Sequence, residues 1–259
     1  MRIGFANNPR REVLGEIEWI GRNGFDFVDL FLEPDRAALE TIEPARIREA
    51  LDRFHLEAMG HLAYYLPIAS PLPQLRKAAV DAAREYLEVF AGIGVPAVTV
   101  HSHWPPRMFS AKEGLGWQME SLRAVLDTAK ALDVRIMYEP VDTEHDAPEH
   151  IETILNELPE ILLHLDLGHS NLFGRNPAAM IRRFAARLHH IHLHDNDGRS
   201  DQHLPPGAGN IDWRAVMRAL REARYDRTIT LEIFSRDKDY VLLARDKVKA
   251  WWARETGAR

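Results

Sequence analysis

The chain has 259 residues, the size of one large domain or two modest ones. Apolar residues make up 46% and charged residues 28%, which excludes collagen-like, disordered and low-complexity proteins. The net charge of −6 disfavours a nucleic-acid partner without excluding one, because proteins that bind phosphate backbones are usually basic.

Short apolar runs alternate with longer amphipathic stretches along the whole chain. The runs predict strands near residues 2–5, 26–31, 56–61, 97–101, 134–139, 161–166, 189–194 and 228–233. The stretches predict helices near residues 11–22, 44–54, 74–92, 114–131, 147–157, 176–187, 213–223 and 239–253. A strand that returns through a helix pairs in parallel with its predecessor. Eight such units in about 250 residues predict an α/β fold of the (β/α)8 TIM-barrel type.

An open doubly wound sheet is the alternative fold. It usually has fewer strands, and no Gly-x-Gly-x-x-Gly turn follows the first predicted strand. No linker or shift in composition divides the chain, so we expect one domain over residues 1–259. The last predicted helix carries Trp251 and Trp252, which can pack on the barrel or on a second copy, so a homo-oligomer stays open.

Cysteine is absent and histidine is abundant, with 13 residues. No disulfide or thiolate site can therefore form, and histidines and carboxylates are the strong metal ligands that remain. The first residues lack the apolar run of a signal peptide, and no stretch approaches a membrane span. We expect a cytoplasmic protein without a membrane partner.

Six successive predicted strands, the third to the eighth, each end in an ionisable residue. Side chains alternate along a strand, so each of these residues faces away from its mostly apolar neighbours. In a barrel they converge on the carboxyl-terminal mouth, where active sites form. Imidazole and carboxylate groups suit Zn²⁺, Mn²⁺, Fe²⁺ or Co²⁺. The alternative for each residue is a solvated strand end. The six are His61, His101, Glu139, Asp166, His192 and Glu232.

Three more residues of ligand type follow these strand ends. His169 comes three residues after Asp166, and Asp201 and His203 lie on a glycine-containing loop after the seventh strand. Such a loop can fold over the mouth. His164 and His190 lie deeper in their strands, where a hydrogen-bonded core histidine is the favoured interpretation.

With these residues in this order, the sequence resembles the xylose isomerase-like TIM barrels, the superfamily that includes AP endonuclease family 2. The resemblance covers nearly the whole chain. Its most specific segment is a His-x-His-x-x-Asp strand followed by Asp-x-His-Leu-Pro-x-Gly-x-Gly-x-Ile-Asp-Trp, which here ends at Trp213. The resemblance implies a barrel with divalent metal at its mouth.

The sugar isomerases and epimerases form one branch of this superfamily. The resemblance to them implies a single metal bound by Glu139, Asp166, His192 and Glu232. It also implies that the two glutamates move a proton next to a metal-polarised carbonyl. His169 and Arg199 would contact sugar hydroxyls. These epimerases carry a substrate-binding Glu six residues after the strand-5 Glu, where this chain has His145, so the resemblance does not support a ketohexose substrate.

Endonuclease IV represents the second branch. The resemblance to it implies three Zn²⁺ held by nine ligands, with Tyr64 at a DNA-contacting position. The acidic charge and the Glu139-Pro140 segment disfavour this branch. The nine counterparts are His61, His101, Glu139, Asp166, His169, His192, Asp201, His203 and Glu232.

The sequence therefore predicts a metal-dependent enzyme with a small-molecule substrate, either a sugar or a sugar phosphate. The favoured activity is isomerase or epimerase, with Glu139 and Glu232 as catalytic residues. The alternatives are a metal-cluster hydrolase of a phosphoester or amide, and a binding protein without catalysis. We expect one to three divalent ions, Zn or Mn, with Mg or Co also compatible. Candidate substrate-binding residues are His103, Trp104, Arg199, Tyr64 and Glu33, although each also has a packing or loop-capping alternative.

Overall fold

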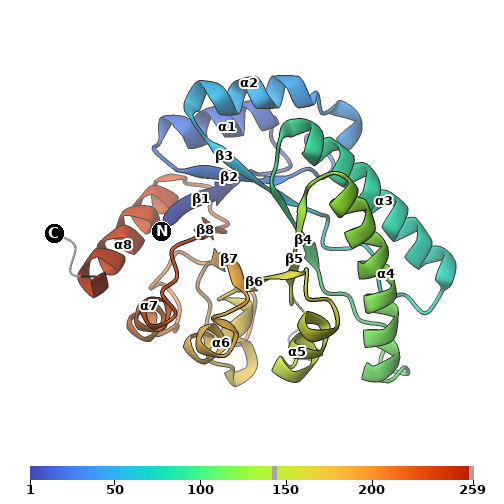
Figure 1. The fold of residues 1–259 in the computed structure, drawn as a ribbon. Coiled ribbons are helices and arrows are strands. Elements are labelled where there is room, and N and C mark those ends of the chain that lie inside the picture. Colours follow the sequence, from blue (N-terminus) through green and yellow to red (C-terminus); the bar gives the residue numbers. More distant parts are fainter. Residues whose placement is uncertain (142–144, 257–259) are drawn as a thin grey trace. The chain divides into compact units, whose positions relative to one another are not determined.

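The computed structural model describes residues 1–141 and 145–256, and its strands follow one another in the order of a closed barrel, β1 to β8 (Figure 1). This order confirms the predicted (β/α)8 class. The predicted strands agree with the structure to within about two residues, the usual uncertainty of such boundaries. The strands are β1 (Arg2–Ala6), β2 (Phe27–Phe31), β3 (Glu57–His61), β4 (Ala97–His101), β5 (Arg135–Glu139), β6 (Leu162–Asp166), β7 (Leu188–Leu193) and β8 (Thr228–Leu231).

An α-helix follows each strand in the described part of the chain. Several helices begin at a proline, a residue that needs no hydrogen-bond acceptor in the first turn. The predictions missed two short 3-10 helices, Leu39–Thr41 (η1) and His169–Gly174 (η2), which are too short to show a period. The α-helices are α1 (Val13–Arg22), α2 (Pro44–Phe54), α3 (Pro73–Ile93), α4 (Ala111–Ala131), α5 (Pro148–Glu157), α6 (Pro177–Phe184), α7 (Trp213–Glu222) and α8 (Asp239–Thr256).

The chain divides into two compact units, each of which is described by itself. One unit comprises residues 6–162 and the other comprises residues 1–5 and 163–259. That the chain forms a single domain stays a prediction. None of the described helices combines the length and the apolar character that crossing a membrane requires.

In the unit 6–162, strands β2 to β5 pair in parallel. Helix α1 packs on α2, α2 on α3, and α3 on α4 (Figure 1). One buried side chain from each strand forms a common apolar layer, made of Phe27, Met59, Ala97 and Met137. Because these parallel strands are held in register over this layer, their carboxyl ends lie at the same edge of the sheet.

In the unit 1–5 and 163–259, β6 pairs with β7, β7 with β8, and β8 with β1. Helix α6 packs on α7, and α7 packs on α8. The interior of β7 is polar: His190 lies with Nδ1 2.7 Å from the Thr228 hydroxyl and Nε2 3.0 Å from the Thr230 hydroxyl. His190 is thus the hydrogen-bonded core histidine that the sequence predicted.

Candidate metal centre

The first cluster of candidate ligands lies in the unit 6–162 and comprises Asp29, His61, His101 and Glu139; we call it the His61 cluster. His61, His101 and Glu139 are the last residues of β3, β4 and β5, and Asp29 lies in the middle of β2. The pairing register places His101 beside Glu139, at the ends of adjacent strands. The period-2 alternation that predicted these positions therefore brings the three strand-end residues together.

The three strand-end side chains of the His61 cluster present their ligand atoms to one another. The Nε2 atoms of His61 and His101 are 2.9 Å apart. Each is also 3.2 Å from Oε2 of Glu139. Ligands bonded at about 2.0–2.1 Å in a tetrahedral site lie about 3.3 Å from one another. The separations in the cluster therefore match three ligands of one divalent ion.

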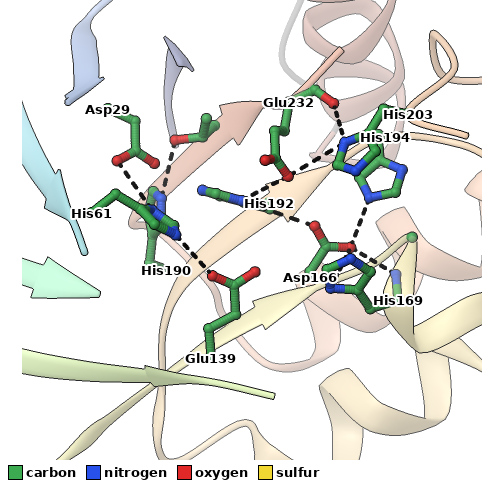
Figure 2. Close-up of polar contacts among 12 residues, drawn as sticks. Asp29, His61, Glu139, Asp166, His169, His190, His192, His194, His203 and Glu232 are labelled. Carbon is green, nitrogen blue, oxygen red and sulfur yellow. Dashed lines mark hydrogen bonds and ion pairs between the residues drawn. The ribbon is translucent and has the colours of Figure 1, made fainter. Parts of the chain in front are cut away.

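Asp29 supports His61 from the opposite side of the imidazole ring. Its Oδ1 lies 3.6 Å from Nδ1 of His61, and both side chains are buried (Figure 2). Burial lowers the pKa of His61, but the carboxylates of Asp29 and Glu139 outweigh this effect and raise it to about 9. A carboxylate behind a histidine also orients the ring of a metal ligand.

The second cluster lies in the unit 1–5 and 163–259, and we call it the His203 cluster. Asp166 ends β6, His169 begins η2, and His192 lies near the end of β7. Asp201 and His203 come from the loop between β7 and α7, and Glu232 directly follows β8. The cluster comprises Asp166, His169, His192, His194, Asp201, His203 and Glu232 (Figure 2 labels all of these except Asp201).

Short polar contacts connect the members of the His203 cluster. The Oδ2 atom of Asp201 lies 3.0 Å from Nε2 of His203 and 3.3 Å from Nε2 of His169. In the same cluster, Nδ1 of His192 lies 3.1 Å from Oε2 of Glu232. The Nδ1–H of His203 donates to the backbone carbonyl of Glu232 at 3.0 Å. Since a carbonyl can only accept, this bond leaves Nε2 of neutral His203 with a free lone pair.

The charges in the His203 cluster shift several pKa values. Burial lowers the pKa of His203, but hydrogen bonding to Asp201 and the nearby carboxylates raise it to about 9. Burial raises the pKa of Asp201, but His169 and His203 bring it well below its usual range. Burial likewise opposes ionisation of Glu232, yet His192 and His203 lower its pKa. The cluster thus favours ionised carboxylates beside histidines, as a metal site requires.

Within each cluster taken by itself, several donor atoms lie close enough together to bind one ion. Those of His61, His101 and Glu139 all lie within 4.8 Å of one another. The same holds for the donor atoms of His169, His194, Asp201 and His203. Both nitrogens of His194 are buried and have no hydrogen-bond partner among the described residues, an arrangement that costs free energy unless a ligand fills it. The residues present therefore fit divalent metal.

Each of the nine residues predicted as metal ligands lies in one of these two clusters. The predictions missed Asp29 as a partner of His61, although a lone carboxylate in the apolar strand Phe27–Phe31 was a usable signal. They also gave no role to His194, which shares the strand alternation of His192. Local sequence did not separate His194 from an ordinary packed histidine.

Two candidate substrate residues follow β4 and are tied into its loop. Nδ1 of His103 accepts from the backbone N–H of Ala69 at 3.3 Å. The indole N–H of Trp104 donates to Asp146 at 2.9 Å, and its ring stacks on His145 with centroids 5.3 Å apart. These contacts correspond to the loop-packing alternative, and a substrate role for either residue stays a prediction.

Of the other three candidates, Tyr64 and Arg199 are exposed and Glu33 is partly buried. Tyr64 is 65% exposed and lies edge-on to His101 with ring centroids 6.4 Å apart. The hydroxyl of Tyr65 donates a hydrogen bond to the carboxylate of Glu33. Burial first, and then the charge of Glu33 and this hydrogen bond, raise the pKa of Tyr65. Arg199 is exposed, and its backbone N–H donates to Asp197 at 2.9 Å. Their roles in substrate binding also stay predictions.

The fold and these clusters define a (β/α)8 barrel with imidazole and carboxylate groups at the carboxyl ends of its strands, where barrel enzymes place their active sites. The chain matches the family model described as "Xylose isomerase-like TIM barrel" over residues 17–255. It therefore belongs to that family, as the sequence resemblance implied.

Individual relatives are more distant. The chain is similar to the uncharacterized protein MJ1311 of Methanocaldococcus jannaschii, with 27% identity over 90% of this chain and 86% of the relative. It is 23% identical to a D-psicose 3-epimerase of Ruminiclostridium cellulolyticum over 85% of this chain and 78% of that protein. Among solved structures, a D-tagatose 3-epimerase-like protein superposes with a TM-score of 0.89 at 24% identity, covering 99% of both chains.

Proposed function

We propose that this protein is a divalent-metal-dependent isomerase or epimerase that acts on a sugar or a sugar phosphate. Relatives and structural neighbours named as sugar 3-epimerases support the substrate class. Both clusters supply the ligand types that such an enzyme needs. The acidic net charge favours a small molecule over a nucleic acid.

The observation that carries the proposal is the state of Glu232. Its carboxylate is buried, yet His192 at 3.1 Å and the nearby His203 lower its pKa. Glu232 is therefore in the ionised form, the form in which a carboxylate can accept a proton from carbon. Glu139 is the second buried glutamate at a strand end, and its exposed fraction is only 1%.

The ligands that would hold metal are the nine that the sequence predicted, three in the His61 cluster and six in the His203 cluster. When bound, a divalent ion supplies a Lewis acid for the carbonyl and hydroxyl oxygens of the substrate. The metal would be zinc or manganese, and the site chemistry also accepts magnesium or cobalt.

The proton transfer is assigned to the two glutamates. One carboxylate takes the proton from the carbon next to the carbonyl, and the electron pair of that C–H bond forms a carbon–carbon double bond as the carbonyl oxygen becomes negative. The other glutamate, in its acid form, returns a proton to carbon and the double bond reverts to a carbonyl. The side on which the proton returns decides whether a stereocentre inverts.

We propose no substrate more specific than a sugar or a sugar phosphate. His145 stands where the related epimerases carry a substrate-binding Glu, and it packs on Trp104. We therefore do not propose a ketohexose in particular. Arg199 is the candidate contact for a phosphate or hydroxyl group, because its guanidinium can donate two parallel hydrogen bonds.

Solvent exchange tests the proposal directly. The protein, loaded with manganese or zinc, is incubated in D2O with a panel of ketoses, aldoses and their phosphates, and loss of the C–H signal is followed by NMR. We expect exchange with at least one sugar, abolished in Glu139→Gln and in Glu232→Gln. The matched control is Glu222→Gln, which removes a half-exposed surface carboxylate paired with Arg182 at 2.6 Å. Exchange that persists in both site variants contradicts the mechanism.

One observation favours a second candidate, a metal-cluster hydrolase. The two clusters hold more potential ligands than one ion needs, as expected for a multinuclear phosphoesterase such as the endonuclease IV branch. In that case Asp201→Ala and His203→Ala should lose metal together with cleavage of a phosphodiester, abasic DNA or an amide. Unchanged metal content in those variants argues against this candidate.

A further inference from the structure

The regular pairing of β4 with β5 ends at Glu139, in the unit 6–162. The register runs from Ala97 and Arg135 to His101 and Glu139, the last residues of the two strands. Pro140 follows, and proline has no N–H with which to extend a ladder. The backbone of Glu139 therefore lies at the boundary between the strand and a loop.

Ser102, the residue after β4, supports this boundary with both its backbone and its side chain. Its backbone N–H donates to the carbonyl of Glu139 at 2.8 Å. Its hydroxyl oxygen accepts from the backbone N–H of Val141 at 3.0 Å. Ser102 thus binds the residues on both sides of Pro140. Because the side chain of Ser102 is buried, water does not readily replace these bonds.

Asp146 fixes the hydroxyl of Ser102. The O–H of Ser102 donates to Oδ2 of Asp146 at 2.5 Å, and Asp146 is buried, with an exposed fraction of 1%. Oδ1 of Asp146 accepts from the indole N–H of Trp104 at 2.9 Å and lies 3.3 Å from the hydroxyl of Tyr138. A hydroxyl has one proton and two lone pairs, so donation to Asp146 leaves the lone pairs of Ser102 for Val141.

We propose that Asp146 is a positioning residue for Glu139 and acts through Ser102. Asp146 orients Ser102, and Ser102 holds the backbone at the end of β5. Oε2 of Glu139 then lies 3.2 Å from Nε2 of both His61 and His101. A functional constellation tolerates displacements of only about 0.5 Å, so a shift of this strand end would disturb it. The inference rests on the metal dependence and the role of Glu139 in the proposed function.

The alternative is that Asp146 only stabilises the fold, since it satisfies several buried donors. That role predicts a lower free energy of unfolding but an unchanged metal affinity in the protein that remains folded. Ser110→Ala is the matched control. Ser110 begins α4 with a capping box, accepting from the backbone N–H of Glu113, so its loss also lowers stability. Ser110 makes no contact in the described chain with the end of β5.

Zinc affinity, measured by chelator competition with Zn²⁺ alone on protein shown to be folded by circular dichroism, tests the proposal. His101→Ala first identifies the zinc equivalent held by the His61 cluster. Ser102→Ala removes the hydroxyl, and Asp146→Asn places an amide donor where the carboxylate accepts. Each should weaken binding of that equivalent about 10- to 100-fold, the range for groups that orient a metal ligand. Ser110→Ala should leave it unchanged.

The visible spectrum of the Co²⁺-loaded protein is a second readout, because its bands report coordination geometry. The band positions should shift in Ser102→Ala and Asp146→Asn but not in Ser110→Ala. A partly unfolded sample would lower the intensity of the bands without moving them. The spectrum therefore separates a displaced Glu139 from a general loss of stability.

Several outcomes would overturn the inference. A loss of zinc affinity below about tenfold in both variants, with unmoved bands, means that Asp146 only stabilises the fold. An effect in only one of the two variants means that Asp146 does not act through Ser102. If His101→Ala loses no zinc, the metal dependence fails and the inference fails with it. If the zinc results are as expected but the parent protein exchanges no sugar proton, the proposed activity is wrong and the positioning of Glu139 stands.

Discussion

The Nε2 atoms of His61 and His101 lie 2.9 Å apart, both facing the same oxygen of Glu139. This arrangement needs a positive charge at its centre, supplied by either a proton or a metal ion. Without metal, Asp29 and Glu139 overcome the effect of burial and hold the pKa of His61 at about 9. Metal and proton therefore compete for the same nitrogen.

Metal binding should accordingly release protons at neutral pH. His61 and His203, both with a pKa of about 9, must each lose a proton to become ligands. We expect apparent metal affinity to rise from pH 7 toward pH 9 and then level off. Calorimetry in buffers of different ionisation enthalpy measures the released protons. An affinity that stays constant across this range contradicts the expectation.

The metal-free protein should show the opposite pH dependence in its stability. The folded-state pKa of His61 is raised from 6.5 to about 9, so its contribution is complete below pH 6.5 and is lost as the pH rises through 9. Urea unfolding of the chelated protein should lose up to about 3 kcal/mol over this interval. Asp29→Asn should flatten the curve, and an equal slope in that variant would exclude His61 as the cause.

Asp29→Asn should also weaken metal binding at the His61 cluster. The amide keeps the volume of the carboxylate but loses the charge that orients His61 as a ligand. We expect a fall in affinity of about 10- to 100-fold, measured by chelator competition. Asp26→Asn, an exposed carboxylate before the same strand, is the control. Equal affinity in the two variants would show that Asp29 does not position His61.

Asp195→Asn should destabilise the loop between β7 and α7. The buried carboxylate of Asp195 accepts from the backbone N–H groups of Asn196, Gly207 and Ile211 and from the indole N–H of Trp213. An amide turns one acceptor into a donor that faces other donors. We expect a loss of about 3 kcal/mol in the free energy of unfolding, measured by urea titration.

The control for Asp195→Asn lies on the same loop. Asp212 caps α7 by accepting from the backbone N–H of Ala215 at 2.9 Å. Asparagine caps helices about as well as aspartate, so Asp212→Asn should change stability by only a few tenths of a kcal/mol. A similar loss in both variants would mean that the charge on this loop matters more than the buried acceptor.

The barrel class could be predicted because its cause is local. Apolar runs of strand length and amphipathic helical stretches repeat eight times, and parallel strands then follow from chain connectivity. The candidate ligands could be predicted for the same reason: His61, His101 and Glu139 end their strands with a fixed parity, and a period of two residues fixes the face of each side chain.

What the sequence could not decide depends on contacts between distant segments. Asp29 supports His61 only because β2 and β3 pair in register, and 32 positions separate the two residues along the chain. The ring of His194 fits only because Gly168, on another segment, has no side chain. The indole N–H of Trp104 donates to Asp146, which lies 42 positions further along the chain. Local pattern names the residues that can carry chemistry, but only the packing of separate segments sets their partners, protonation and tautomers.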